Sequence, residues 1–180
     1  MGADPFREAI WQEAVKVERK TATSSLAQRK AANWWGYLFY LVGTPTTALA
    51  ALAGGSAVAD NKRLAAALAI AAAITSSVWG FLNPGGKASE HRVASARFRK
   101  IENYARVFAN VRWNSGATNA ELEHELAELE AKWNEADADS PHVAQRLYTR
   151  AIKTINDDFA KRKDRGARAL ETQERSPIAN

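Results

Sequence analysis

The sequence predicts an all-α integral membrane protein, in which an antiparallel two-helix transmembrane hairpin is joined to a cytoplasmic helical or coiled-coil bundle. Three observations predict this class. Residues 31–59 and 64–86 carry no charged side chain, and only the four residues 60–63 separate these two tracts. Beyond residue 86, apolar side chains recur at helical spacing among many charges. Average values hide this division, because a charged content of 25% and a mean hydropathy of -0.38 describe an ordinary soluble domain.

The first element, residues 1–30, is predicted to be a cytoplasmic amphipathic helix. Phe6, Ile10, Trp11 and Val17 stand among charged residues in this segment. An apolar face of this kind is typical of a helix that rests on a membrane surface, and we expect it on the cytoplasmic leaflet.

The second element, residues 31–86, is predicted to be the transmembrane hairpin, with a short external turn at residues 60–63. About 20 apolar residues in a helix cross a hydrocarbon core roughly 30 Å thick, and each tract reaches this length. The first tract is rich in large apolar side chains, whereas the second is mostly alanine and would insert weakly alone. The short turn forces the second tract to pair with the first, so we expect them to insert together.

Three alternatives compete with the hairpin. A soluble protein of 180 residues could bury an alanine-rich hairpin, although two uncharged spans exceed what so small a core covers on every face. The sequence Ala57-Val58-Ala59 before Asp60 has the form of a signal-peptidase site, but the preceding apolar run is too long for a signal peptide. A hairpin lying in the interface would need a polar face, and neither tract has one.

Lysine and arginine predict the orientation of the hairpin, since these residues concentrate on the cytoplasmic side of membrane helices. Only Lys62 and Arg63 lie at the tip, whereas both ends of the hairpin are flanked by many more: Lys16, Arg19, Lys20, Arg29 and Lys30 before it, and Lys87, Arg92, Arg97, Arg99, Lys100 and Arg106 after it. Both termini are therefore expected in the cytoplasm of a multi-pass inner-membrane protein. One interfacial belt of aromatic side chains is expected, comprising Trp34, Trp35, Tyr37, Tyr40, Trp79 and Phe81.

Several residues of the hairpin are candidates for a function within the membrane. A proline and two adjacent glycines weaken the first helix and could act as hinges, and hydroxyls could line a pore. The candidate pore-lining or hinge residues are Thr44, Pro45, Thr46, Thr47, Gly54, Gly55 and Ser56. For any single hydroxyl, a hydrogen bond back to its own helix is the better explanation. Two helices cannot enclose a polar path, so a pore would require several subunits.

The third element, residues 87–163, is predicted to be a cytoplasmic extension of three helices. Ala94, Phe98, Ile101, Ala105 and Phe108 alternate at spacings of four and three, which is typical of a coiled coil. Thr118 and Glu121 form a predicted capping box before Leu122, Leu126, Leu129 and Trp133, and Pro141 is expected at the first position of a helix bearing Leu147, Ala151, Ile155 and Phe159. Residues 164–180 are expected to form a flexible tail.

Charge and apolar spacing in this extension predict how its helices associate. Residues 118–139 carry eight acidic residues and one basic residue, whereas residues 87–113 and 146–168 are strongly basic. Opposite charges would therefore select which helices pack together. The candidate oligomerisation seam comprises Phe98, Ile101, Ala105 and Phe108, and a homo-oligomer is expected.

Neither catalysis nor nucleic-acid binding is predicted. The chain has no cysteine, no glycine-rich phosphate loop and no spaced acid–base or metal-ligand set, so no catalytic, metal or cofactor site is expected. His91, His124 and His142 are each interpreted as polar surface residues. The sequence pI of 9.6 comes from lysine and arginine near the membrane tracts, so anionic lipid headgroups are the expected partner and nucleic acid is not.

Residues 33–108 resemble the SLATT domain family. The similarity follows the order WWGYLFYLVGTPTTALAALAGGSAVADNKRLAAALAIAAAITSSVWGFLNPGGKASEHRVASARFRKIENYARVF. It consists of an aromatic start, Gly43-Thr44 in the first span, a polar tip, an Asn83-Pro84 exit, and His91-Arg92 followed by a helix with Tyr104.

This resemblance implies a two-helix membrane effector of bacterial antiphage and conflict systems. Such an effector is expected to oligomerise into a pore that disrupts the membrane when a sensor or nucleotide-signal-producing defence protein triggers it. The family carries no catalytic residues. The alternative is a non-conducting membrane anchor that docks a cytoplasmic partner through its helices.

Overall fold

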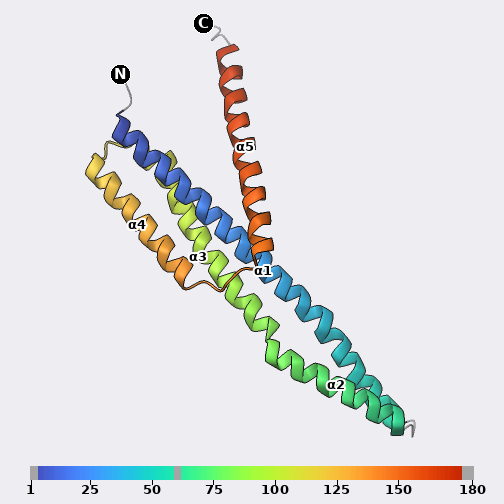
Figure 1. Ribbon diagram of the computed structural model, residues 1–180. Coiled ribbons are helices and arrows are strands. Elements are labelled where there is room, and N and C mark those ends of the chain that lie inside the picture. The colour runs from blue at the N-terminus through green and yellow to red at the C-terminus, as the bar shows by residue number, and fades with distance from the viewer. Residues whose placement is uncertain (1–3, 59–61, 176–180) are drawn as a thin grey trace. The chain divides into compact units, whose positions relative to one another are not determined.

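The structure is a computed structural model that describes residues 4–58 and 62–175. Within these residues the chain is helical and contains no strand (Figure 1). Its elements are α1 (Pro5–Val58), α2 (Lys62–Leu82), α3 (Pro84–Asn110), the short 3-10 helix η1 (Arg112–Asn114), α4 (Asn119–Ala138) and α5 (Gln145–Arg175). The predicted all-α class is confirmed, and two helices are long and apolar enough to cross a membrane.

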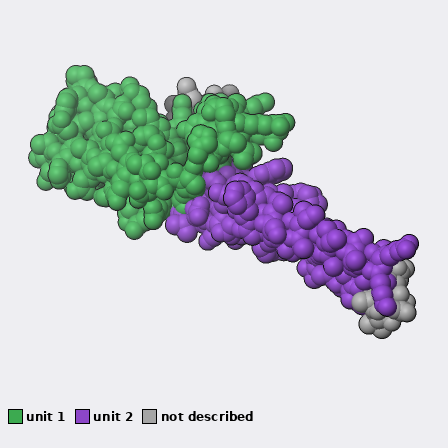
Figure 2. Space-filling view, turned by 60° about the horizontal axis from the view of Figure 1, so that its bottom comes forward, with its two compact units in different colours: residues 1–27, 94–180 green, residues 28–93 purple. Residues whose placement is uncertain are grey.

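The helices form two compact units, which have different colours in Figure 2. The bundle unit comprises Met1–Ala27 and Ala94–Asn180, and the hairpin unit comprises Gln28–Val93. Because α1 and α3 each run from one unit into the other, both helices contribute residues to both units.

The first half of α1 belongs to the core of the bundle unit. We expected a separate helix over residues 1–30, but α1 continues for 54 residues, since no glycine or proline interrupts it before Gly36. Ile10, Ala14 and Val17 are buried beside residues of α3 and α4. This apolar face is therefore covered by protein, which leaves it unable to rest on a lipid leaflet.

Apolar stripes on α1, α3 and α4 form the rest of that core, and these three helices lie side by side in Figure 1. The stripe predicted on α3 is confirmed as one buried face, comprising Ala94, Phe98, Ile101, Ala105 and Phe108. The stripe predicted on α4 is confirmed as well, with Leu122, Leu126 and Leu129 buried and Trp133 partly buried. Burying one large apolar side chain stabilises a fold by roughly 1.5–3 kcal/mol, so these stripes hold the unit together.

Buried hydroxyls in the bundle unit find acceptors across or along the helices. Ser25 Oγ donates to the Ser95 carbonyl at 3.2 Å, and Ser95 Oγ donates to the Ser25 carbonyl at 2.9 Å. Thr21, which is fully buried, donates to the carbonyl of Val17 at 2.8 Å. Since each hydroxyl keeps a hydrogen bond, small polar residues at this α1–α3 contact can be buried at little cost.

The connection from α3 to α4 is held by the start of α1. The guanidinium of Arg7 donates to the carbonyls of Trp113 at 2.9 Å and Ser115 at 3.0 Å, and it lies 5.3 Å from the centre of the Trp113 ring. The predicted capping box is confirmed, because Thr118 accepts from the backbone of Glu121 while the Glu121 side chain accepts from the backbone of Thr118. These contacts set where α4 begins.

The beginning and end of α5 differ from the prediction. We expected the helix to begin at Pro141, but it begins at Gln145, and Pro141 lies in the linker from α4. Proline fixes φ near −65°, which suits an extended linker as well as a first helical turn, so it does not locate a helix start by itself. We also expected a flexible tail from residue 164, whereas α5 continues to Arg175. Strong helix formers dominate this stretch, and losing an apolar stripe does not end a helix.

The basic helix α5 packs on α1. Ala151 is fully buried, the Arg19 guanidinium lies 5.0 Å from the centre of the Phe159 ring, and Arg162 forms an ion pair with Glu18 at 3.4 Å. Burial raises the pKa of the Glu18 carboxyl, and the charge of Arg162 opposes this rise. The end of the acidic α4 instead pairs with the middle of α3, through Asp139 and Arg97 at 3.5 Å.

Candidate membrane-spanning hairpin

The hairpin unit pairs the second half of α1 with α2, and its apolar side chains remain largely exposed. Only 6% of the most apolar 18-residue stretch is buried in each of the two candidate membrane helices. The exposed large side chains include Phe39, Tyr40, Leu41, Leu52, Leu64, Ile70, Ile74, Val78 and Phe81. A buried core hairpin of a soluble protein would cover such residues with protein. These two helices could instead cross a membrane, where lipid would cover them.

Aromatic side chains at one end of the hairpin unit join its two helices. The rings of Phe39 and Trp79 are 5.1 Å apart, and Phe39 also packs edge-on against Tyr40 at 5.5 Å. A Cβ atom added to Gly43 would lie 3.4 Å from the Trp79 ring, so the missing side chain of Gly43 makes room for this contact. Of the residues predicted as an interfacial belt, Trp79 therefore holds α1 against α2, and it does so through Phe39, which was not part of the prediction.

Hydroxyls on both helices bond to their own helix. Thr46 and Thr47 donate to the carbonyls of Val42 and Gly43 at 2.8 and 3.1 Å. Thr75 and Ser77 on α2 donate to carbonyls four residues earlier, at 2.7 and 2.9 Å. The interpretation preferred for any single hydroxyl is confirmed for these four. Such hydroxyls are satisfied within one helix, so they do not require a polar environment.

Some of the candidate pore-lining residues share a groove. It has a volume of about 480 Å³ and is lined by Phe39, Tyr40, Gly43, Thr44, Thr46, Thr47 and Trp79. Pro45 interrupts the hydrogen bonding of α1 here, because proline has no N–H to donate to the carbonyl of Leu41. Gly54 and Gly55 are not part of the groove, and a Cβ atom at either would meet nothing within 4 Å. The side chain of Ser56 lies outside the described residues.

The junction between α2 and α3 is built on Asn83. This residue has a φ of 41°, in the left-handed region that asparagine tolerates better than most residues. Its Oδ1 accepts the backbone N–H of Gly86 at 3.1 Å, and a Cβ atom on Gly86 would lie 2.8 Å from the Asn83 Cγ. The second span therefore ends at Leu82, and Gly85-Gly86, expected to end it, lie in the first turn of α3.

His91 is a buried residue of this unit, which corrects its interpretation as a surface residue. Its side chain is 4% exposed, and Nδ1 lies 2.6 Å from Oε1 of Gln28 on α1. Burial lowers the pKa of His91, Lys87 adds to this effect, and Glu90 opposes it. The other two histidines are exposed, as predicted. Extending the alternating spacing of the α3 stripe backwards by three residues from Ala94 reaches His91, so the pattern contained this signal.

Two cations lie against α1 close to its aromatic residues. Lys87 Nζ is 5.7 Å from the centre of the Trp35 ring, and a guanidinium nitrogen of Arg92 would lie 3.6 Å from a Cβ atom on Gly36. Cations beside aromatic rings are typical of a membrane interface, where phosphate groups and hydrocarbon meet.

The residues predicted as an oligomerisation seam lie in the bundle unit instead. Phe98, Ile101, Ala105 and Phe108 are at most 7% exposed and contact the chain's own core. Their apolar surface is already used within the chain, because the first half of α1 and α4 cover it. Any contact between copies must therefore rest mainly on other side chains.

Among the described residues, no group of three His, Cys, Asp or Glu side chains could hold a metal ion. The chain matches no protein-family model, no curated protein and no solved structure.

Proposed function

We propose that this chain is an oligomeric membrane effector of a bacterial antiphage or conflict system. The hairpin unit spans the inner membrane with both termini in the cytoplasm, and several copies form a pore when a defence sensor or a nucleotide signal triggers them. The membrane assignment rests on the exposed apolar surface, since only 6% of each apolar stretch is covered by protein. The defence role rests on the resemblance of residues 33–108 to the SLATT family.

The groove beside Pro45 supports α1 as the pore-lining helix. The Leu41 carbonyl lacks its helical donor, and the side-chain hydroxyl of Thr44 has no hydrogen-bond partner among the described residues, so these groups favour water or another subunit over lipid. The helix carries no charge along this stretch, so the pore would discriminate weakly between ions.

A second function is favoured by a different observation. Thr46, Thr47, Thr75 and Ser77 are satisfied by their own helix, as expected for helices that face lipid and conduct nothing. In that case the chain is a membrane anchor, and the bundle unit positions a cytoplasmic partner.

Labelling of single cysteines tests the membrane assignment, because the chain has no cysteine of its own. In intact cells, an impermeant maleimide should label Arg63→Cys, whereas Gly116→Cys should react only after permeabilisation. Both positions are exposed, so the difference reports the side of the membrane. Labelling of Gly116→Cys in intact cells would contradict the proposed topology.

Membrane potential separates the pore from the anchor. The protein would be expressed together with the products of its neighbouring genes, and potential would be recorded during phage challenge. Depolarisation should occur with wild type and be weakened by Thr47→Leu, which fills the groove, whereas Ser77→Ala should behave as wild type because Ser77 does not line it. An unchanged potential, with the protein recovered in membranes, would favour the anchor.

A further inference from the structure

A long groove between α3 and α4 remains open in the bundle unit. It has a volume of about 670 Å³, and no residue of α1 or α5 lines it. Ile101, Phe108, Leu129 and Ala136 form an apolar floor. The same two helices therefore bury one face against α1 and leave a second face without a cover.

The α3 side of the groove carries a second stripe at coiled-coil spacing. Lys100, Tyr104 and Val107 line the groove, and Val111 continues their spacing of four, three and four residues just beyond the end of α3. Tyr104, Val107 and Val111 are 50%, 55% and 64% exposed. Alternation of three and four residues places side chains on one helix face, where they pack against another helix. This stripe is distinct from the buried one that runs through Phe98 and Ile101.

The two walls of the groove have opposite charge. Arg97, Lys100 and Arg112 line the α3 wall, whereas Glu125, Glu128, Glu135 and Asp139 line the α4 wall with Lys132. Ion pairs connect the walls at the two ends, between Arg97 and Asp139 and between Arg112 and Glu125. Between these ends, the side chains of Lys100 and Glu135 form no hydrogen bond or ion pair in the part of the chain that the structure describes.

We propose that a second copy of this chain occupies the groove. A twofold axis parallel to α3 and α4 would place α3 of each copy opposite α4 of the other, so that each basic wall meets an acidic wall. The apolar stripe of one copy would then cover the apolar floor of its partner. The parallel arrangement rests on the proposed function, since anchoring in one membrane gives both copies the same orientation.

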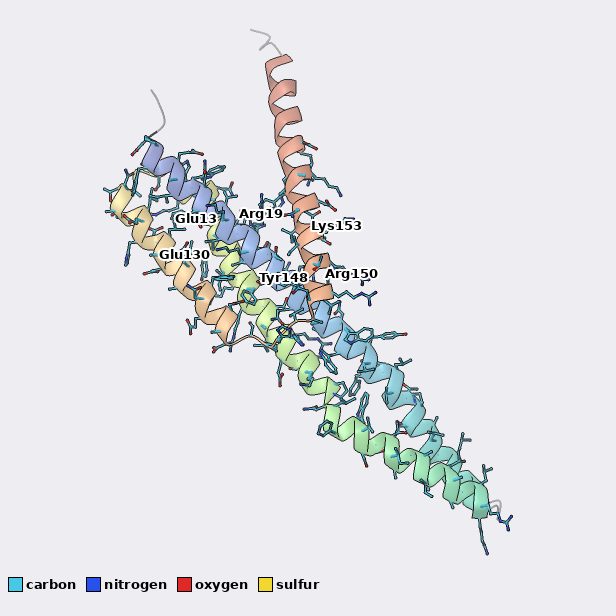
Figure 3. The ribbon with its side chains drawn as sticks, viewed as in Figure 1. Glu13, Arg19, Glu130, Tyr148, Arg150 and Lys153 are labelled. Carbon is cyan, nitrogen blue, oxygen red and sulfur yellow. The ribbon has the colours of Figure 1, made fainter. Side chains whose placement is uncertain are left out.

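Charge complementarity favours a second copy over α5 of the same chain. The contacts of α5 are with α1, through Phe159 and Arg162, and Figure 3 shows Arg150 and Lys153 of α5 at a distance from α4. A helix of net positive charge such as α5 would also meet the basic α3 wall. The twofold arrangement instead opposes unlike charges along both walls.

Charge reversal in differently tagged, co-expressed full-length chains tests the pairing. K100E alone and E135K alone each place like charges opposite one another at both symmetric contacts, so each variant should pair poorly with itself. A mixed pair of K100E with E135K restores both contacts between chains. Recovery of the mixed pair in affinity capture should exceed that of either self-pair by about fivefold or more.

The mixed pair distinguishes contacts between chains from contacts within one chain. Each variant retains like charges within its own groove, so an intramolecular role for these residues would give no preference for the mixed pair. That result would overturn the proposal, as would capture of a different protein by the wild-type groove in place of a second copy. V107D should weaken self-pairing several-fold, and I152D, at an exposed apolar position on α5, should leave it unchanged.

Pairing and membrane anchoring are read separately in this experiment. Capture is carried out both on detergent-solubilised membranes and on the soluble fraction, and the distribution of the protein between the fractions is recorded. If the mixed pair is preferred but the protein is not recovered in membranes, the interface is supported and the proposed function is contradicted. If the protein is recovered in membranes but the mixed pair is not preferred, the membrane assignment is supported and the interface is contradicted.

Discussion

The two halves of α1 have similar secondary structure but opposite burial. In the bundle unit, Ile10, Ala14 and Val17 are covered by α3 and α4. In the hairpin unit, Tyr40, Leu41 and Leu52 are exposed although the surrounding sequence is more apolar. Apolar side chains are thus covered by protein in one region and not in the other.

This difference shows where each region obtains its stability. The bundle unit is stabilised by its own packing, and its polar residues pair across helices, as Ser25 and Ser95 do. In the hairpin unit, most large apolar side chains remain exposed, and the hydroxyls of residues such as Thr46 bond locally. We therefore expect the bundle unit to be sensitive to loss of volume, and the hairpin unit to be sensitive to added charge.

Loss of volume should have the largest effect, and only in the bundle unit. Phe98 is 1% exposed and Phe81 is 89% exposed. Phe98→Ala should lower the free energy of unfolding by about 3–5 kcal/mol, since it leaves a cavity in a packed core. Phe81→Ala should change it by less than about 0.5 kcal/mol. Denaturant unfolding of the full chain in detergent would measure both, and equal losses would contradict the contrast.

Added charge should have the opposite selectivity. Ile74 lies in the middle of α2 and is 61% exposed. Ile74→Lys should disfavour insertion, because lysine at the centre of a membrane helix costs about 2.5–3.5 kcal/mol. The fraction of protein that resists carbonate extraction from membranes should fall. Ile152→Lys, on α5, should leave this fraction unchanged, and an unchanged fraction for Ile74→Lys would mean that α2 does not cross the bilayer.

The buried His91 should give the hairpin unit a pH dependence. Its pKa is lowered from 6.5 by burial, so the unfolded chain takes up the proton first as pH falls. The stability contributed by neutral His91 should be complete above about pH 6.5 and be lost as pH falls below this value. His91→Asn should flatten the pH profile of the free energy of unfolding between about pH 7 and 5. His124→Asn, at an exposed position, should keep the wild-type slope.

Removal of single hydroxyls should change the free energy of unfolding least, and the size of the change should still differ between the bundle unit and the hairpin unit. Thr46→Val should change the free energy of unfolding by less than about 0.5 kcal/mol, because the Val42 carbonyl keeps its helical N–H donor. Ser95→Ala should cost about 1 kcal/mol, since it removes a hydrogen bond between buried groups of two helices. Thermal unfolding would compare the two variants, and a larger loss for Thr46→Val would contradict local satisfaction.

The sequence by itself determined that the chain is helical and which faces of its helices are apolar, although not where every helix begins and ends. These features depend only on neighbours within a few helical turns. They are the two uncharged tracts, the capping box at Thr118 and Glu121, and the apolar spacing through Phe98 or Leu126. Local hydrogen bonds of hydroxyls, such as that of Thr47, are determined in the same way. Such features follow from the period of the helix and from short-range sterics, so they can be predicted from the sequence.

Tertiary structure decided which partner covers each face. The spacing of Phe98 and Ile101 cannot tell whether another helix of the chain or a second copy covers them, and the structure assigns this role to α1 and α4. Likewise, the buried His91 lies with its Nδ1 2.6 Å from Oε1 of Gln28, which is 63 residues earlier in the chain. Contacts between distant residues depend on how whole helices pack, and the period of one helix carries no information about its neighbour.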